Sequence, residues 1–243
     1  MKKLFPILCA ALMLSAGFST VTASPVKNNT TKISGDERDV KNFDGIASGG
    51  PITVIVKLGN TESLRFEGDA DAISTLVTEV KGSILIIRPQ TSWTSWARKY
   101  EGKKIIAYVT AKKISSLTMS GDGSISVAGT VNTSELTTTL SGSGQIKVDV
   151  NAKEITSVVS GSGILNITGK TQEASVTLSG SGAFNGNNLT TENISSRISG
   201  SGSINIHANR KISALISGSG SVNYSGSPEV DKTVVGSGRV RKI

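Results

Sequence analysis

The sequence predicts an all-β protein, a right-handed single-stranded parallel β-helix with Ser-Gly-Ser-Gly coil repeats of about 19 residues. Three observations support this fold class: a repeated glycine tetrad, apolar residues that keep register with it, and a composition poor in aromatic rings. Aromatic residues make up only 4% of the 243 residues, whereas glycine supplies 27 positions. A core with so few rings is built mainly from Val, Ile and Leu, which favours strands and tight turns over a helical bundle.

The tetrad Ser-Gly-x-Gly marks each repeat, and successive copies begin 21, 19, 19, 20, 18 and 18 residues apart. The copies, of which the last is degenerate, begin at Ser120, Ser141, Ser160, Ser179, Ser199, Ser217 and Val235. One repeat cannot bury its own apolar face, but stacked repeats form a continuous core. The chirality of parallel crossovers predicts a right-handed coil. We expect the glycines to provide positive φ or close backbone approach at the corners.

The residues five positions after each tetrad start are apolar, and we expect them to form one buried ladder. They are Ile125, Ile146, Leu165, Phe184, Ile204 and Val222. Phe184 is followed two positions later by Gly186, where the other repeats carry a side chain. The large ring is therefore predicted to fill the space that this glycine leaves.

The N-terminal segment, residues 1–23, has the pattern of a secretory signal peptide. Lys2 and Lys3 precede an apolar stretch, and small residues lead up to Ala23, after which we expect cleavage. The sole cysteine, Cys9, lies within this leader, so the exported chain needs no disulfide. We expect a periplasmic, outer-membrane-surface or secreted protein, with no transmembrane segment after signal cleavage.

Residues 24–39 read as an N-terminal extension, and residues 40–113 as a β-rich part that lacks the repeat. Within that part, strands are expected at 52–56, 83–87 and 104–109. The stretch from Ala70 to Lys81 fits either a short helix, with Asp69 as its cap, or another strand. Residues 114–243 form the repeat part of the same domain.

An ordered series of motifs resembles the head GIN domain family of auto-transporter adhesins of bacterial envelopes. The series consists of Phe43-Asp44-Gly45-Ile46, Ser48-Gly49-Gly50, Leu64–Asp69, Ile84–Ile87, Ile114–Leu117 and the Ser-Gly-Ser-Gly coils. The resemblance runs from about Val40 to about Val240. It implies an exported, β-helical and non-enzymatic surface or periplasmic protein, and it implies no catalytic residues.

The residues themselves argue against an enzyme. One His and one Cys exclude a His/Cys metal cluster or a cysteine protease, and no metal or cofactor is expected. Parallel β-helices can carry polysaccharide-processing enzymes, which need clustered carboxylates. Glu154 and Glu173 share a repeat position and could stack near a turn, and His207 is expected to be an exposed turn residue. A polysaccharide-processing enzyme is therefore only a remote alternative.

The positive charge is concentrated between Arg88 and Lys113, where seven cations face a single acid, Glu101. We expect Arg88–Lys104 to be an exposed loop and the place of ligand contact. The candidate binding residues are Trp93, Trp96, Arg98, Lys99, Tyr100, Lys103 and Lys104. Cations and rings together suit an anionic glycan, lipopolysaccharide or an envelope protein, whereas export makes nucleic acid an unexpected partner. Alternatively, the tryptophans fold back as a lid over the coils, and one loop could do both.

A second candidate surface is the row six positions after each tetrad start. It contains a possible outward polar ladder of Asn166, Asn185, Asn205 and Asn223. These amides could hydrogen-bond a glycan, or they could satisfy one another from coil to coil. The second interpretation is favoured.

Two functions from different classes follow. The first is an exported, non-catalytic, adhesin-like binding module of the cell envelope that recognises a glycan or another surface polymer. The second is a structural or assembly protein of the envelope, which acts through self-association or protein partners because unpaired coil ends invite pairing. A homo-oligomer is possible under either function.

Overall fold

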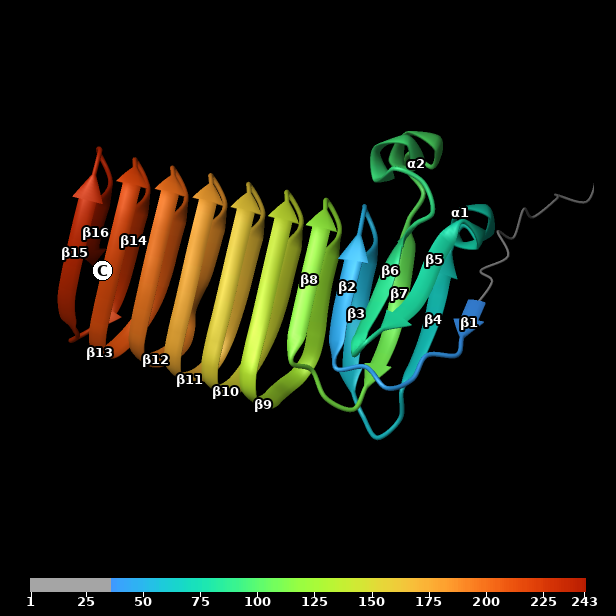
Figure 1. Cartoon of the computed structure of the whole chain (residues 1–243), viewed down its shortest axis with the longest axis horizontal. Helices are drawn as coiled ribbons and strands as arrows, with labels where there is room; N and C mark the ends of the chain where they lie inside the picture. The colour runs from blue at the N-terminus through green and yellow to red at the C-terminus, as the bar shows by residue number, and fades with distance from the viewer. Residues whose placement is uncertain (1–35) are drawn as a thin grey trace, which may run out of the picture. The chain divides into compact units, whose positions relative to one another are not determined.

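The computed structural model describes residues 36–243, apart from the side chain of Trp93. The expected signal peptide and residues 24–35 lie outside the described residues. Sixteen strands form one sheet that is wound into stacked coils, and Figure 1 shows the coils side by side. The parallel β-helix predicted from the tetrads is thereby confirmed.

Five long strands each make one complete coil. They are β9 (Ser124–Gly142), β10 (Gln145–Gly161), β11 (Ile164–Gly180), β12 (Ala183–Gly200) and β13 (Ser203–Gly218). In β10, every second side chain is buried from Ile146 to Ala152, and the pattern resumes three positions later at Ile155. This three-residue step marks the bend, so each long strand contributes one segment to each of two sides of the coil. In β10, Gln145–Ala152 lies on what we call the first side and Ile155–Gly161 on the second side.

The predicted ladder is present. Ile146 pairs in register with Ile125 and with Leu165, and the ladder continues through Phe184 and Ile204 to Val222. Each of these six side chains is at most 1% exposed. At Gly186 an added Cβ would lie 2.6 Å from Cε1 of Phe184, so the ring does occupy the space left by that glycine.

The tetrads form one corner of every coil, and their first glycine has positive φ. At Gly180, φ is +115°, and a Cβ would lie 2.6 Å from the carbonyl oxygen of Gly161 in the preceding coil. Both a left-handed backbone and close backbone contact therefore require glycine at this position.

The N-terminal part extends both sides of the coil stack with short strands. They are β1 (Asp36–Arg38), β2 (Gly45–Gly49), β3 (Thr53–Leu58), β4 (Ser63–Gly68), β5 (Leu76–Lys81), β6 (Ile84–Pro89), β7 (Ile105–Ala111) and β8 (Ser116–Gly121). On the first side, β3 and β7 continue the parallel stack, β4 runs antiparallel to β7, and β1 runs antiparallel to β4. On the second side, β8, β2 and β6 are parallel and β5 is antiparallel. Strand β1 shows that the expected extension already contributes to the sheet.

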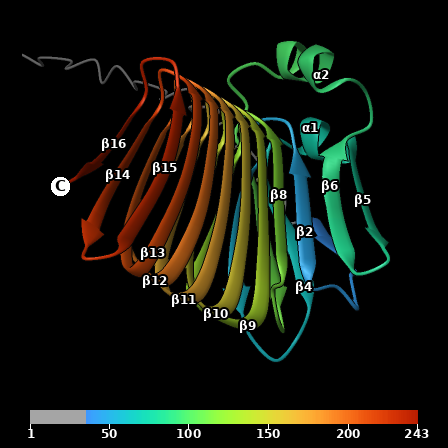
Figure 2. The same cartoon turned by 60° about the vertical axis from the view of Figure 1, so that its left-hand side comes forward.

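The stretch from Ala70 to Lys81, left open above, contains both elements. Helix α1 (Ala70–Ser74) begins at Asp69, whose carboxylate accepts a hydrogen bond from the amide of Ala72 at 3.1 Å, and β5 follows it. Because α1 connects β4 to β5, it carries the chain from the first side to the second. Figure 2 shows α1 and α2 (Trp93–Lys99) at the same edge of the N-terminal part.

The side chain of Arg38 ties the two sides together at this end. Its guanidinium donates hydrogen bonds to the carbonyl oxygens of Ile73 and Leu76, at 3.0 and 2.8 Å, and to the hydroxyl of Thr78 at 2.7 Å. It also lies 4.8 Å from the ring centroid of Phe66. A residue of β1 on the first side thus holds α1 and β5 on the second.

Three further strands follow the long coils: β14 (Ser221–Gly226), β15 (Glu229–Val235) and β16 (Arg239–Lys242). β14 and β16 lie on the first side, and β15 pairs with β13 on the second. Of these residues, Val234 is 37% exposed and Val235 63% exposed, whereas Val222 is buried. The exposed apolar side chains at this end are therefore Val234 and Val235 on β15, together with Ile243 after β16.

Candidate binding site

The segment that we expected to be an exposed loop contains helix α2, which corrects the prediction. Its composition of small polar residues resembled a loop, but its aromatic residues have helical spacing. Trp96 and Tyr100 are four positions apart, and their ring centroids lie 5.1 Å from each other. The cations Arg98 and Lys99 occupy the last turn, where the helix dipole favours positive charge.

Trp96 anchors this segment. Its side chain is 3% exposed, and Nε1 donates a hydrogen bond to Oγ1 of Thr75 at 2.8 Å. That hydroxyl in turn donates to the carbonyl oxygen of Ala72 at 2.8 Å. The indole is therefore buried against the end of α1, which gives Trp96 a structural role.

A pocket of about 410 Å³ lies beside α2. It is lined by Thr75, Gln90, Thr91, Ser95, Trp96, Lys99 and Tyr100, and we call it the α2 pocket. Three of the predicted residues, Trp96, Lys99 and Tyr100, meet there, and Nζ of Lys99 lies 5.1 Å from the Tyr100 ring centroid. Trp93 begins the helix, whereas Arg98, Lys103 and Lys104 do not line the pocket. Gln90 lies in the expected contact segment but was not among the candidate residues, whereas Thr75 follows α1 and no sequence signal pointed to it.

Ion pairs with acids elsewhere in the chain neutralise four of the seven cations between Arg88 and Lys113. Lys103 lies 2.8 Å from Asp69, Lys112 3.4 Å from Glu62 and Lys113 3.1 Å from Asp44. Arg88 lies 3.8 Å from Glu79. Sequence position alone had suggested one positive patch, but four of its seven cations are paired with acids from other strands and loops. The charge that remains at α2 belongs mainly to Arg98, Lys99 and Lys104, all exposed.

The ion pair between Lys103 and Asp69 shifts the pKa of both side chains. Hydrogen bonds from Lys103 and from the amide of Ala72 lower the pKa of Asp69 below its ordinary value, and the Asp69 carboxylate raises the pKa of Lys103. Asp69 thus stabilises two segments: it caps α1, and its ion pair with Lys103 fixes the segment that follows α2.

The asparagine ladder is present, and its amides bond to one another, as the favoured interpretation predicted. Nδ2 donates to Oδ1 of the preceding coil from Asn185 to Asn166 at 3.0 Å, from Asn205 to Asn185 at 3.1 Å and from Asn223 to Asn205 at 2.8 Å. Nε of Arg241 then donates to Oδ1 of Asn223 at 2.7 Å. The same row continues to Lys147 and Ser126 in the other direction. We call this series the polar row.

The acids and the histidine do not assemble a reactive centre. Glu154 does stack on Glu173, and Glu135 joins them because a register shift near Lys147 absorbs two extra residues of β9. All three are exposed. His207 is not a turn residue: it lies half-buried in β13, and its Nδ1 is 2.8 Å from Oγ of Ser225. Within residues 36–243, no group of three His, Cys, Asp or Glu residues could hold a metal ion.

Several solved structures share this fold. One, described as a putative adhesin from Bacteroides fragilis, has 21% sequence identity and a TM-score of 0.78, and the alignment covers 88% of this chain and 98% of that one. A putative lipid binding protein from Parabacteroides distasonis has 21% identity, a TM-score of 0.70 and the same two coverages. A putative adhesin from Parabacteroides merdae has 19% identity and a TM-score of 0.66 over 88% of this chain and 97% of that one. At such identities the likeness concerns the fold.

A search of curated proteins finds no match to the chain. Within the described part, no helix is long and apolar enough to cross a membrane. A family sequence model, however, matches residues 42–228, which include most of the strands described above. The chain therefore belongs to the family described as "Putative auto-transporter adhesin, head GIN domain".

Proposed function

We propose that the protein is an exported, non-catalytic, adhesin-like binding module of the bacterial cell envelope, and that it binds an anionic glycan at the α2 pocket. The family membership supports the adhesin class and an envelope location. The single observation that supports the ligand class is the convergence of Lys99, Tyr100 and several neutral hydrogen-bonding groups around one pocket.

The lining of the α2 pocket suits a sugar that carries a carboxylate or a sulfate. The half-buried ring of Tyr100 offers an apolar surface to the C–H face of a sugar, and Gln90, Thr91 and Ser95 provide donors and acceptors for its hydroxyls. The ammonium group of Lys99 supplies the charge. A volume of about 410 Å³ lies within the range of small-ligand pockets. Lipopolysaccharide, which combines sugars with anionic groups, has the same chemistry.

A glycan array tests the proposal with the protein purified after removal of residues 1–23. We expect hits among anionic glycans, which Lys99→Ala and Tyr100→Ala weaken. Lys99→Ala should leave the melting temperature unchanged, whereas Tyr100→Ala also loses the ring contact with Trp96 and should lower it slightly. Lys170→Ala, which removes an exposed cation from the coil stack, is the matched control. Anionic glycans that bind all three variants equally, or an array without hits, would refute a site at this pocket.

A structural or assembly role is the second candidate, and the exposed Val234 and Val235 on β15 favour it. In that case the protein self-associates in solution and gives no hits on the array. Val235→Lys then restores a monomer, which sedimentation velocity detects.

A further inference from the structure

The polar row extends beyond the repeats and crosses the N-terminal strands. Ser126 of β9 pairs in register with Ile55 of β3, which pairs with Tyr108 of β7. Tyr108 pairs with Arg65 of β4, and Arg65 pairs with Glu37 of β1. All these side chains point outward on the first side. A single line of side chains therefore runs from β1 to β16, although its N-terminal members have no repeat signature in the sequence.

The half-buried amides of Asn166, Asn185 and Asn205 keep at least half of their hydrogen-bonding capacity, whereas Asn223 is only 8% exposed and offers little to a ligand. A side-chain amide has two donors and two acceptor lone pairs, and the ladder uses one donor and one lone pair of each inner asparagine. The ladder also fixes the orientation of each amide, so a ligand would not have to order them on binding. The remaining donors and acceptors repeat at the strand spacing of about 4.8 Å.

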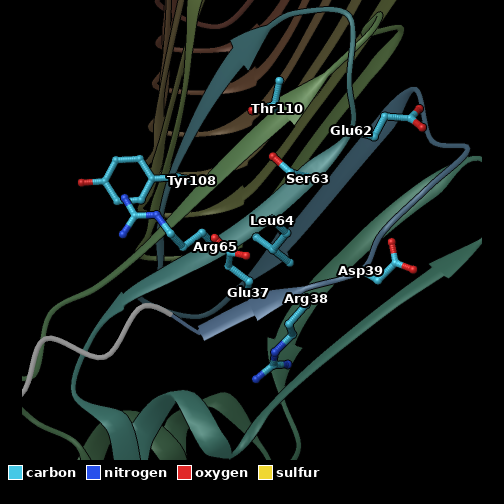
Figure 3. Close-up of a pocket in the computed structure, with 9 residues that line it drawn as sticks. All are labelled: Glu37, Arg38, Asp39, Glu62, Ser63, Leu64, Arg65, Tyr108 and Thr110. Carbon is cyan, nitrogen blue, oxygen red and sulfur yellow. The ribbon is translucent and has the colours of Figure 1, made fainter.

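The N-terminal end of the row opens into a pocket of about 460 Å³, which we call the Tyr108 pocket. Glu37, Ser63, Arg65, Tyr108 and Thr110 line it, and the Arg65 guanidinium lies 4.6 Å from the centroid of the Tyr108 ring. Figure 3 shows Arg65 reaching towards Tyr108 while Arg38 points away from that pair. The pocket lies beside β1, which has only three residues and so covers only part of β4.

We propose that this line is a second binding surface, which holds an extended, neutral polysaccharide along the coil stack with one end in the Tyr108 pocket. The inference takes its ligand class, carbohydrate, from the proposed function, but it assigns a different side of the molecule. Between Lys147 and Arg241 the row carries no ionised side chain, which complements a polymer whose hydroxyls each donate and accept. Phosphate-rich chains are disfavoured because the three acids that line the pocket, Glu37, Asp39 and Glu62, outnumber its two arginines, Arg38 and Arg65.

This arrangement predicts that affinity depends on ligand length. The sugars next to the pocket pass Ile55, Ser126 and Lys147. Each sugar beyond them reaches the amide of the next coil, so binding strengthens until the row is covered. A pocket that recognised only a chain end would give the same affinity for short and long ligands.

Isothermal titration calorimetry of the protein without residues 1–23 tests the inference. The ligands are linear neutral oligosaccharides of glucose, mannose and N-acetylglucosamine, each in a series of increasing length. The test variant carries Asn185→Ser and Asn205→Ser, because Ser126 already occupies this row. We expect affinity to rise with length and the double variant to bind the longest ligand about tenfold more weakly, from the net value of two hydrogen bonds. Asn151→Ser, which removes a similar amide pair with Asn132 at 3.3 Å elsewhere, should bind normally.

The outcomes separate the two proposals. Length-dependent binding that the double variant weakens and Tyr100→Ala leaves intact supports the second surface, whatever happens at the α2 pocket. The second surface would be excluded if no neutral oligosaccharide bound, if affinity did not change with ligand length, or if Asn151→Ser lost as much affinity as the double variant. If only anionic glycans bind and only Tyr100→Ala weakens them, the proposed function stands and this inference fails.

Discussion

The coil stack and the N-terminal part solve the same packing problem in different ways. In the stack, β10 and β11 pair from Gln145 to Gly161 without a register shift, and like residues lie on like. In the N-terminal part, short strands run both parallel and antiparallel, and single residues such as Arg38, Asp69 and Trp96 join the elements. Repetition therefore supplies a scaffold, whereas individual contacts shape the pockets. Each prediction below tests one half of this contrast.

The largest effect is expected inside the stack. Leu165→Asp places an unpaired charge in a fully buried ladder with no partner, so the protein should not fold and should be recovered as aggregate. Solubility and far-UV circular dichroism measure this. The neighbouring Ile164 is 42% exposed on the outer surface, so Ile164→Asp should fold like the native chain. Equal behaviour of the two variants would contradict the assigned ladder.

Loss of the indole at α2 should have the next largest effect. Trp96→Ala removes a buried ring, and such substitutions cost about 3–5 kcal/mol. Trp96→Phe keeps most of the packing but loses the hydrogen bond to Thr75, which should cost about 1 kcal/mol. Chemical denaturation measures both values. A denaturation midpoint unchanged by Trp96→Ala would show that the helix does not anchor the N-terminal part.

Arg38→Ala should loosen one region of the molecule. Three hydrogen bonds from a charged donor to α1 and β5 disappear, with a loss of about 2–3 kcal/mol in the free energy of local opening. Hydrogen exchange should accelerate in β1, α1 and β5 and remain native in β10–β13. Faster exchange throughout the coils would mean that the two parts unfold as one unit.

The smallest effect concerns pH. Because the pKa of Asp69 is lower in the folded protein than in the unfolded chain, its contribution is present above the unfolded value, about 3.8, and is lost as pH falls. Asp69→Asn keeps a capping residue but loses the pair with Lys103. The melting temperatures of the native chain and this variant should differ at pH 7, begin to converge below about pH 4, and meet once pH has fallen through the lower pKa of Asp69 in the folded protein. A difference that stays constant with pH would exclude the ion pair as its source.

The sequence was sufficient to predict the part of the fold in which one residue type recurs at one spacing. The ladder from Ile125 to Val222, the glycine corners and the asparagine row all follow from the tetrads. The helix at Trp93–Lys99 did not, because its small polar residues are as common in loops and its burial depends on Thr75, eighteen residues before the helix begins. Ion pairs such as Lys113–Asp44 join distant segments, so position in the chain overestimated the basic patch.

The Tyr108 pocket shows the same limit. Glu37, Arg65 and Tyr108 come from three strands, of which β4 runs opposite to β1 and β7, and no period links them. Only the sheet register reveals that they continue the row of asparagines. Sites in the repeats could thus be predicted from spacing, whereas sites in the N-terminal part required the structure.

The coils of the stack are equivalent units, and the N-terminal part adds to them through contacts of its own. Deleting Gln145–Gly163 removes one 19-residue coil and joins Gly144 to Ile164, so β9 would pair with β11 in the native register. Thermal melting followed by circular dichroism should show a cooperative transition for this variant. Deleting only Gln145–Glu154 removes half a coil, so the chain would enter the second side with no first-side segment between β9 and β11, and the deletion should abolish that transition. If both deletions failed to fold, or both folded alike, the coils would not be equivalent units.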